Sequence, residues 1–95
     1  MMTDQAQLRQ EIYDNRQQAA KFYRQYFSFD DEKIMPLVRQ MFELEIQDPD
    51  NPALPDLQAQ VSTLDTEAEP LLTQARLYAQ KAQTAQDQLD RLIFD

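Results

Sequence analysis

The chain has 95 residues with a net charge of −8, and it contains no glycine, cysteine or histidine. The missing residue types exclude disulfides, thiol nucleophiles, histidine-dependent acid–base or zinc chemistry, and glycine-rich phosphate loops. The acidic balance argues against direct binding to nucleic acid or to an anionic membrane. We therefore expect a protein without cofactor or metal whose partner is another protein.

The length predicts one domain covering residues 1–95. The N-terminal residues lack the basic and apolar regions of a signal peptide, and no apolar run is long enough to span a bilayer, so we expect a cytoplasmic protein. Ser28 and Ser62 have no histidine to activate them, and we expect no enzymatic activity.

The first predicted helix covers about residues 4–28, with Thr3 or Asp4 as its N-cap. Its apolar positions follow a four-three spacing that is typical of a heptad seam. These positions are Leu8, Ile12, Asn15, Ala19, Phe22, Tyr26 and Phe29. Asn15 is the polar exception, which either specifies register or oligomeric state or lies at a solvated edge.

A second stripe widens this face through Tyr13, Ala20, Tyr23 and Phe27. Aromatic residues dominate binding hot spots, but they also fill cores. We expect the seam aromatics to lie inside the bundle. Tyr23 and Phe27 are the better candidates for an aromatic partner-binding surface.

The second predicted helix is short, about residues 35–47. A break at residues 29–34 precedes it, in which residues 29–33 form either a turn or one isolated helical turn. Pro36 disfavours helical dihedrals at Met35 and suits the first position of a helix. A wide apolar face comprises Ile34, Leu37, Val38, Met41, Phe42 and Leu44. Three prolines between Asp48 and Pro55 predict a loop over residues 48–55.

The third predicted helix covers about residues 56–94 and has the most regular seam. Its four-three spacing runs without a miss through Leu57, Val61, Leu64, Ala68, Leu71, Ala75, Tyr78, Ala82, Ala85, Leu89 and Leu92. Alanine in the seam permits close helix approach. Pro70 lies within this segment, and Thr66 with Glu69 forms a capping-box pattern. The segment is therefore either one helix kinked near Pro70 or two helices meeting near residues 65–67.

These helices predict an all-α fold, either a helical hairpin or a small three-helix bundle with a long C-terminal Ala-rich coiled-coil helix. At about 1.5 Å per residue the third helix is nearly as long as the first two together. We favour the hairpin, in which the second helix pairs with residues 56–69 and the first with residues 70–92. An uncovered seam would suit a homodimer, with Asn15, Ala68, Ala75, Tyr78, Ala82 and Ala85 as seam or oligomer positions.

Acidic residues are concentrated in the middle of the chain. Residues 30–69 hold eleven acids against Lys33 and Arg39, a net charge of −9. The candidate partner-binding acids are Glu43, Glu45, Asp48, Asp50, Asp56, Asp65, Glu67 and Glu69. A field of one sign attracts and orients a partner of the opposite sign.

The leading hypothesis is therefore an acidic protein-binding module or inhibitor that docks on a basic site of a larger protein. That site can be a nucleic-acid-binding one, as for phage-type inhibitors of host defence systems that act as nucleic-acid mimics. The alternative is a homodimeric coiled-coil scaffold or chaperone-like adaptor that acts through apolar helix faces. The acids would then serve only for solubility.

Overall fold

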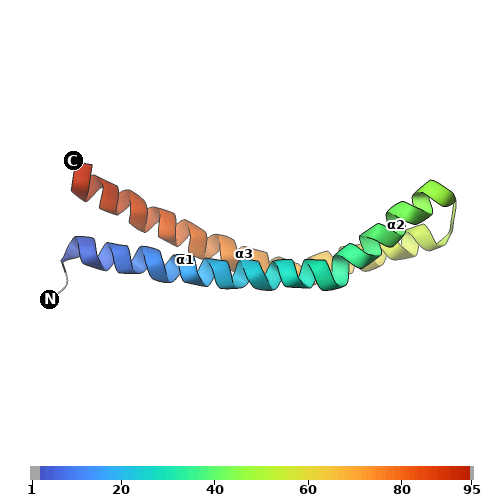
Figure 1. Ribbon diagram of the computed structural model, residues 1–95, viewed down its shortest axis with the longest axis horizontal. Helices are drawn as coiled ribbons and strands as arrows, with labels where there is room; N and C mark the ends of the chain where they lie inside the picture. The colour runs from blue at the N-terminus through green and yellow to red at the C-terminus, as the bar shows by residue number, and fades with distance from the viewer. Residues whose placement is uncertain (1–2, 95) are drawn as a thin grey trace. The chain divides into compact units, whose positions relative to one another are not determined.

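The computed structural model describes residues 3–94, which are almost entirely helical (Figure 1). The helix α1 covers Asp4–Phe29, a π-helical turn η1 covers Asp30–Ile34, α2 covers Met35–Gln47, and α3 covers Ala53–Phe94. The described residues contain no β-strand. The prediction of an all-α helical hairpin with a long C-terminal helix is confirmed.

The chain divides into two compact units. The first, which we call the terminal unit, joins residues 3–24 to residues 71–94. The second, which we call the acidic unit, covers residues 25–70 and so contains η1, α2 and the first part of α3. The helix lengths predict this pairing, with α1 against the second half of α3 and α2 against the first.

The first helix begins at a side-chain cap and is stabilised along its surface. The amide of Ala6 donates to the hydroxyl oxygen of Thr3 at 3.1 Å, which makes Thr3 the predicted N-cap. The side-chain amide of Gln10 donates to the carboxylate of Asp14 at 2.9 Å, four residues further along. Pairs of this kind stabilise a helix by about 0.2–0.5 kcal/mol each, and α3 repeats them at Gln83–Asp87 and Gln86–Asp90.

Residues 29–34 form neither a turn nor an isolated helical turn, because α1 continues through η1 directly into α2. Met35 precedes Pro36 and is nevertheless helical, with φ −57° and ψ −38°. Its amide donates to the carbonyl oxygen of Asp30, one residue beyond the usual α-helical acceptor. Proline in a helix lacks a donor and crowds the carbonyl four residues before it, here that of Glu32. The wider π turn lies over this stretch and keeps the chain helical.

The predicted loop over residues 48–55 is shorter in the structure, because α3 begins at Ala53 rather than Asp56. The side-chain oxygen of Asn51 accepts a hydrogen bond from the Ala53 amide at 2.8 Å and caps the helix. Pro52 and Pro55 then fall before or within the first turn, where missing amide donors cost little. The rule that excludes proline from a helix does not apply to this turn.

The helix α3 runs without interruption through Pro70, so the alternative of two helices meeting near residues 65–67 is wrong. The Thr66 hydroxyl donates to the carbonyl oxygen of Ser62 at 3.0 Å, as threonines inside helices do. It therefore does not act as the N-cap of a capping box. The seam continues on both sides of Pro70, since Ala68 and Ala75 are both buried.

The predicted seams form the packed interior of the chain, except at the last position, Leu92, which is 51% exposed. In the terminal unit Ile12, Ala85 and Leu89 pack together with Leu8 at their edge. The rings of Phe22 on α1 and Tyr78 on α3 stack with centroids 5.8 Å apart. The buried residues of α3 all occupy predicted seam positions: Leu57, Ala68, Ala75, Ala82, Ala85 and Leu89. The heptad spacing therefore identified the buried face.

Candidate protein-binding surfaces

The two units differ in charge. All eleven acids of residues 30–69 lie in the acidic unit, with only Lys33 and Arg39 as bases. The described part of the terminal unit carries seven bases and five acids. The acidic unit, at −9, thus carries more negative charge than the whole protein, whose net charge is −8.

The eight predicted partner-binding acids are all exposed. Glu43 and Glu45 lie on α2, and Asp48 and Asp50 lie in the turn that follows it. The remaining four lie on the first part of α3: Asp56, Asp65, Glu67 and Glu69. Asp56 is in the first turn of α3, where a carboxylate also interacts favourably with the helix dipole.

The turn between α2 and α3 is held by its own polar groups. The Asp48 amide donates to the carbonyl oxygen of Leu44 at 2.7 Å, closing the end of α2. The side-chain amide of Asn51 donates to the Asp48 carboxylate at 3.2 Å, and the Asn51 backbone amide donates to the Asp48 carbonyl oxygen at 3.1 Å. Asp48 therefore shapes the turn, whereas the exposed Asp50 has no such contact in the described structure.

The apolar face of α2 consists of two stripes. The first, at Leu37, Met41 and Leu44, is half-buried. The second contains Phe42, which is 58% exposed, and Ile46, which is 85% exposed. Within the described chain α2 contributes no buried residue. The sequence predicted one wide face that included Phe42 and omitted Ile46. The four-residue spacing from Phe42 to Ile46 is the sequence signal that places Ile46 on the second stripe.

The two aromatic candidates, Tyr23 and Phe27, differ in exposure. Phe27 is 57% exposed, and its ring stands edge-on to Tyr26 at 5.5 Å. Tyr23 is half-buried, as are the seam aromatics Phe22 and Tyr26. Tyr23 belongs to the terminal unit and Phe27 to the acidic unit. Both lie on α1 four residues apart, a spacing that places two side chains on the same side of a helix.

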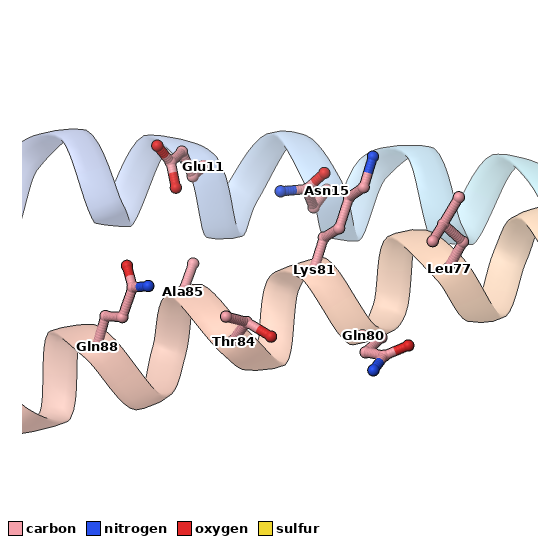
Figure 2. A pocket seen from close by; sticks show the side chains of 8 residues that line it. All are labelled: Glu11, Asn15, Leu77, Gln80, Lys81, Thr84, Ala85 and Gln88. Carbon is pink, nitrogen blue, oxygen red and sulfur yellow. The ribbon is translucent and has the colours of Figure 1, made fainter.

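The seam and oligomer candidates lie inside the chain's own helix pairs. Ala68, Ala75, Ala82 and Ala85 are buried, and Tyr78 is half-buried against Phe22. Asn15 is half-buried between the buried Ile12 and Ala19. In the terminal unit it borders a shallow hollow of about 470 Å³ whose other lining residues include Glu11, Lys81 and Gln88 (Figure 2). Asn15 thus lies at a polar edge of the seam.

Residues 3–94 were also compared with the requirements of a metal site and of a membrane-spanning helix. This stretch contains no group of three or more acidic, cysteine or histidine side chains arranged to hold a metal ion. None of its helices combines the length and apolarity needed to cross a bilayer. A comparison with protein-family models, with curated proteins and with solved structures finds no match for this chain.

Proposed function

We propose that this chain is a non-enzymatic protein-binding module whose acidic unit docks on a basic surface of another protein. The observation that supports this most is the net charge of −9 within one compact unit, against a nearly neutral terminal unit. Exposed charges of one sign raise the rate of encounter with an oppositely charged partner and select its orientation.

The distribution of these acids favours a binding role over a solubilising one. Solubility requires charge but does not require its concentration in one unit. Carboxylates on α2, in the following turn and on α3 present several negative groups from one short stretch of structure. Phosphate groups present the same sign of charge, so a nucleic-acid-binding surface is the kind of basic site that such a unit suits best. We infer that the module acts as an inhibitor by covering that surface.

The test is a capture experiment with the tagged chain in a lysate of its source cell, washed at low and at high salt. One variant reverses four exposed acids of the acidic unit: Glu43→Lys, Glu45→Lys, Asp50→Lys and Asp65→Lys. Asp48 is left unchanged because its carboxylate accepts a hydrogen bond within the turn. We expect a basic partner that binds the original chain, is lost at high salt, and is lost from this variant.

A matched control changes the net charge equally in the other unit, through Asp4→Lys, Glu11→Lys, Asp14→Lys and Asp87→Lys. All four are exposed positions of the terminal unit. The hydrogen bonds that Asp14 and Asp87 accept from Gln10 and Gln83 contribute only about 0.2–0.5 kcal/mol each. The proposal requires that this control keeps the partner. If both variants lose the partner equally, only the overall charge of the chain affects binding. If both retain the partner equally, the acids of the acidic unit do not contribute to binding. Circular dichroism verifies that both variants remain helical.

The second candidate function is a homodimeric scaffold or adaptor that acts through apolar helix faces. The exposed side chains of Phe42 and Ile46 in the acidic unit, and of Leu92 and Phe94 in the terminal unit, favour it. Its contacts would have to use these residues, because the alanine seam is already buried within the chain. Sedimentation velocity at several concentrations distinguishes a dimer from a monomer.

A further inference from the structure

The outer side of α2 carries a continuous apolar stripe, which we call the outer stripe: Met35, Val38, Phe42 and Ile46. At about 100° per residue these four positions fall within an arc of roughly 80°. Met35 and Val38 are half-buried, whereas Phe42 and Ile46 are mostly exposed. The stripe becomes more exposed along α2 toward its C-terminal end.

The packing of the acidic unit does not account for this stripe. The neighbouring stripe at Leu37, Met41 and Leu44 supplies the more covered side of α2. Single exposed apolar side chains are ordinary on protein surfaces. A phenylalanine and an isoleucine one turn apart on the same side form a contiguous patch, and such patches mark interaction surfaces.

Acidic side chains surround the exposed end of the stripe. On a helix Glu43 and Glu45 fall on opposite sides of the line from Phe42 to Ile46, each at roughly 80° from it. Asp48 and Asp50 follow at the C-terminal end of α2. An apolar centre with an acidic rim complements a surface with an apolar centre and a basic rim.

We propose that the outer stripe binds a basic amphipathic helix of the partner protein. This inference rests on the proposed function and specifies that the basic surface of the partner is an amphipathic helix. Apolar side chains spaced three and four residues apart on the partner helix would pack on Phe42 and Ile46, with lysine or arginine beside Glu43 and Glu45.

The geometry favours a helix over an extended segment as the occupant. From Met35 to Ile46 the stripe rises about 16 Å, which matches three turns of a partner helix. An extended peptide gains affinity by adding to the edge of a sheet, and residues 3–94 offer no strand to pair with. A helix satisfies its own backbone hydrogen bonds and needs only side-chain contacts.

The probe is a synthetic fluorescent peptide of leucine and lysine, about 18 residues or five turns long, with the leucines on one helical side. A second peptide has the same composition, but its residues are reordered so that the leucines no longer lie on one side of the helix. Fluorescence polarisation measures the binding of each peptide to the full chain. We expect the amphipathic peptide to bind at least about tenfold more tightly than the scrambled one.

Paired variants locate the binding surface. Phe42→Ser with Ile46→Ser is expected to weaken binding of the amphipathic peptide about tenfold at any salt concentration. Leu92→Ser with Phe94→Ser is the matched control, since these exposed apolar residues belong to the terminal unit, and it is expected to leave the affinity unchanged. Glu43→Gln with Glu45→Gln should weaken binding at low salt and have little effect at high salt.

Each remaining outcome overturns the inference in a distinct way. If both peptides bind equally and the Phe42 and Ile46 variant binds like the original chain, the stripe has no role and acidic docking alone survives. If neither peptide binds, an amphipathic helix is not the occupant, and the capture experiment alone decides whether the acidic unit docks on a basic protein. If sedimentation shows a dimer that this variant makes monomeric, the occupant of the stripe is a second copy of the chain.

Discussion

The rings of Phe22 and Tyr78 lie parallel, with an interplanar angle of 6° and centroids 5.8 Å apart. One comes from α1 and the other from α3, and the buried Ala19, Ala75 and Ala82 are the adjacent seam positions. Alanine seams bury little area per residue, so larger side chains contribute disproportionately to such a helix pair. We infer that this stacked pair is a principal contact of the terminal unit.

Removing either ring should destabilise the protein measurably. We expect Phe22→Ala or Tyr78→Ala to lower the free energy of unfolding by about 2–4 kcal/mol, less than the loss for a fully buried ring. The double variant should reveal a coupling of about 0.5–1.5 kcal/mol between the rings. Urea unfolding followed by circular dichroism measures each value. Tyr13→Ala is the control, because Tyr13 is exposed, and a loss equal to that of Tyr78→Ala would contradict the assignment.

The alanine seam is sensitive to added volume. Ala75 is fully buried, with 0% of its surface exposed. We expect Ala75→Leu to reduce the free energy of unfolding by about 1–3 kcal/mol because the helices cannot approach as closely. The adjacent exposed position supplies the control Gln74→Leu, whose effect should stay within about 0.5 kcal/mol. A stable Ala75→Leu variant would show that this seam is not packed within the chain.

The buried faces could be predicted from the sequence, whereas several helix ends could not. Heptad spacing identified Ile12, Ala75 and Leu89 because burial along paired helices follows this repeat. The prolines led to wrong predictions of the helix boundaries, because the effect of a proline depends on the turn in which it lies. A π turn accommodates Pro36, and Pro55 lies in a first turn where its missing donor costs little.

Of the features of the candidate protein-binding surface, only its charge could be predicted from the sequence. Counting acids between residues 30 and 69 suffices to find the acidic unit, because these residues are contiguous in the chain. The outer stripe needed the structure. Leu37 and Phe42 both belong to apolar stripes of α2 with helical spacing, and only the packing of the acidic unit distinguishes the half-buried side from the exposed one.

The turn that joins α2 to α3 depends on Asn51. Its side-chain oxygen caps α3 through Ala53, and its side-chain amide holds the Asp48 carboxylate. We expect Asn51→Ala to cost about 1 kcal/mol, and Asn51→Asp to retain the cap while losing the contact with Asp48. Thermal unfolding should therefore rank the original chain above Asn51→Asp, with Asn51→Ala lowest. Gln58→Ala, at an exposed position inside α3, is the control. An alanine variant as stable as the original would contradict the capping role.

Pro70 imposes a local cost on α3. It lies inside a continuous helix and is exposed, so its ring fills no buried space. Replacing it restores the amide donor for the Thr66 carbonyl, and we expect Pro70→Ala to raise the free energy of unfolding by about 1–3 kcal/mol. Thr73→Ala, one turn further along the exposed side, is the control and should change stability by about 0.5 kcal/mol or less. A destabilised Pro70→Ala variant would show that the helices pack around the proline.

Charge repulsion within the acidic unit should make the stability of the protein depend on salt. The exposed acids of α3 share this unit with those of α2 and with only two bases. Raising the ionic strength from about 0.01 to 0.15 M shortens the screening length from about 30 to 8 Å, so we expect the melting temperature to rise. Asp65→Asn, Glu67→Gln and Glu69→Gln together should raise it at low salt and flatten its salt dependence.

The matched control for this salt effect removes acids from the terminal unit through Glu11→Gln and Asp14→Asn. The described part of that unit already carries more bases than acids. Neutralising these two acids should therefore leave the melting temperature unchanged or lower it. If both sets of substitutions raised the melting temperature equally, the repulsion would arise from total charge. Its position in the acidic unit would then have no consequence for stability, and the electrostatic argument for a docking surface there would lose its support.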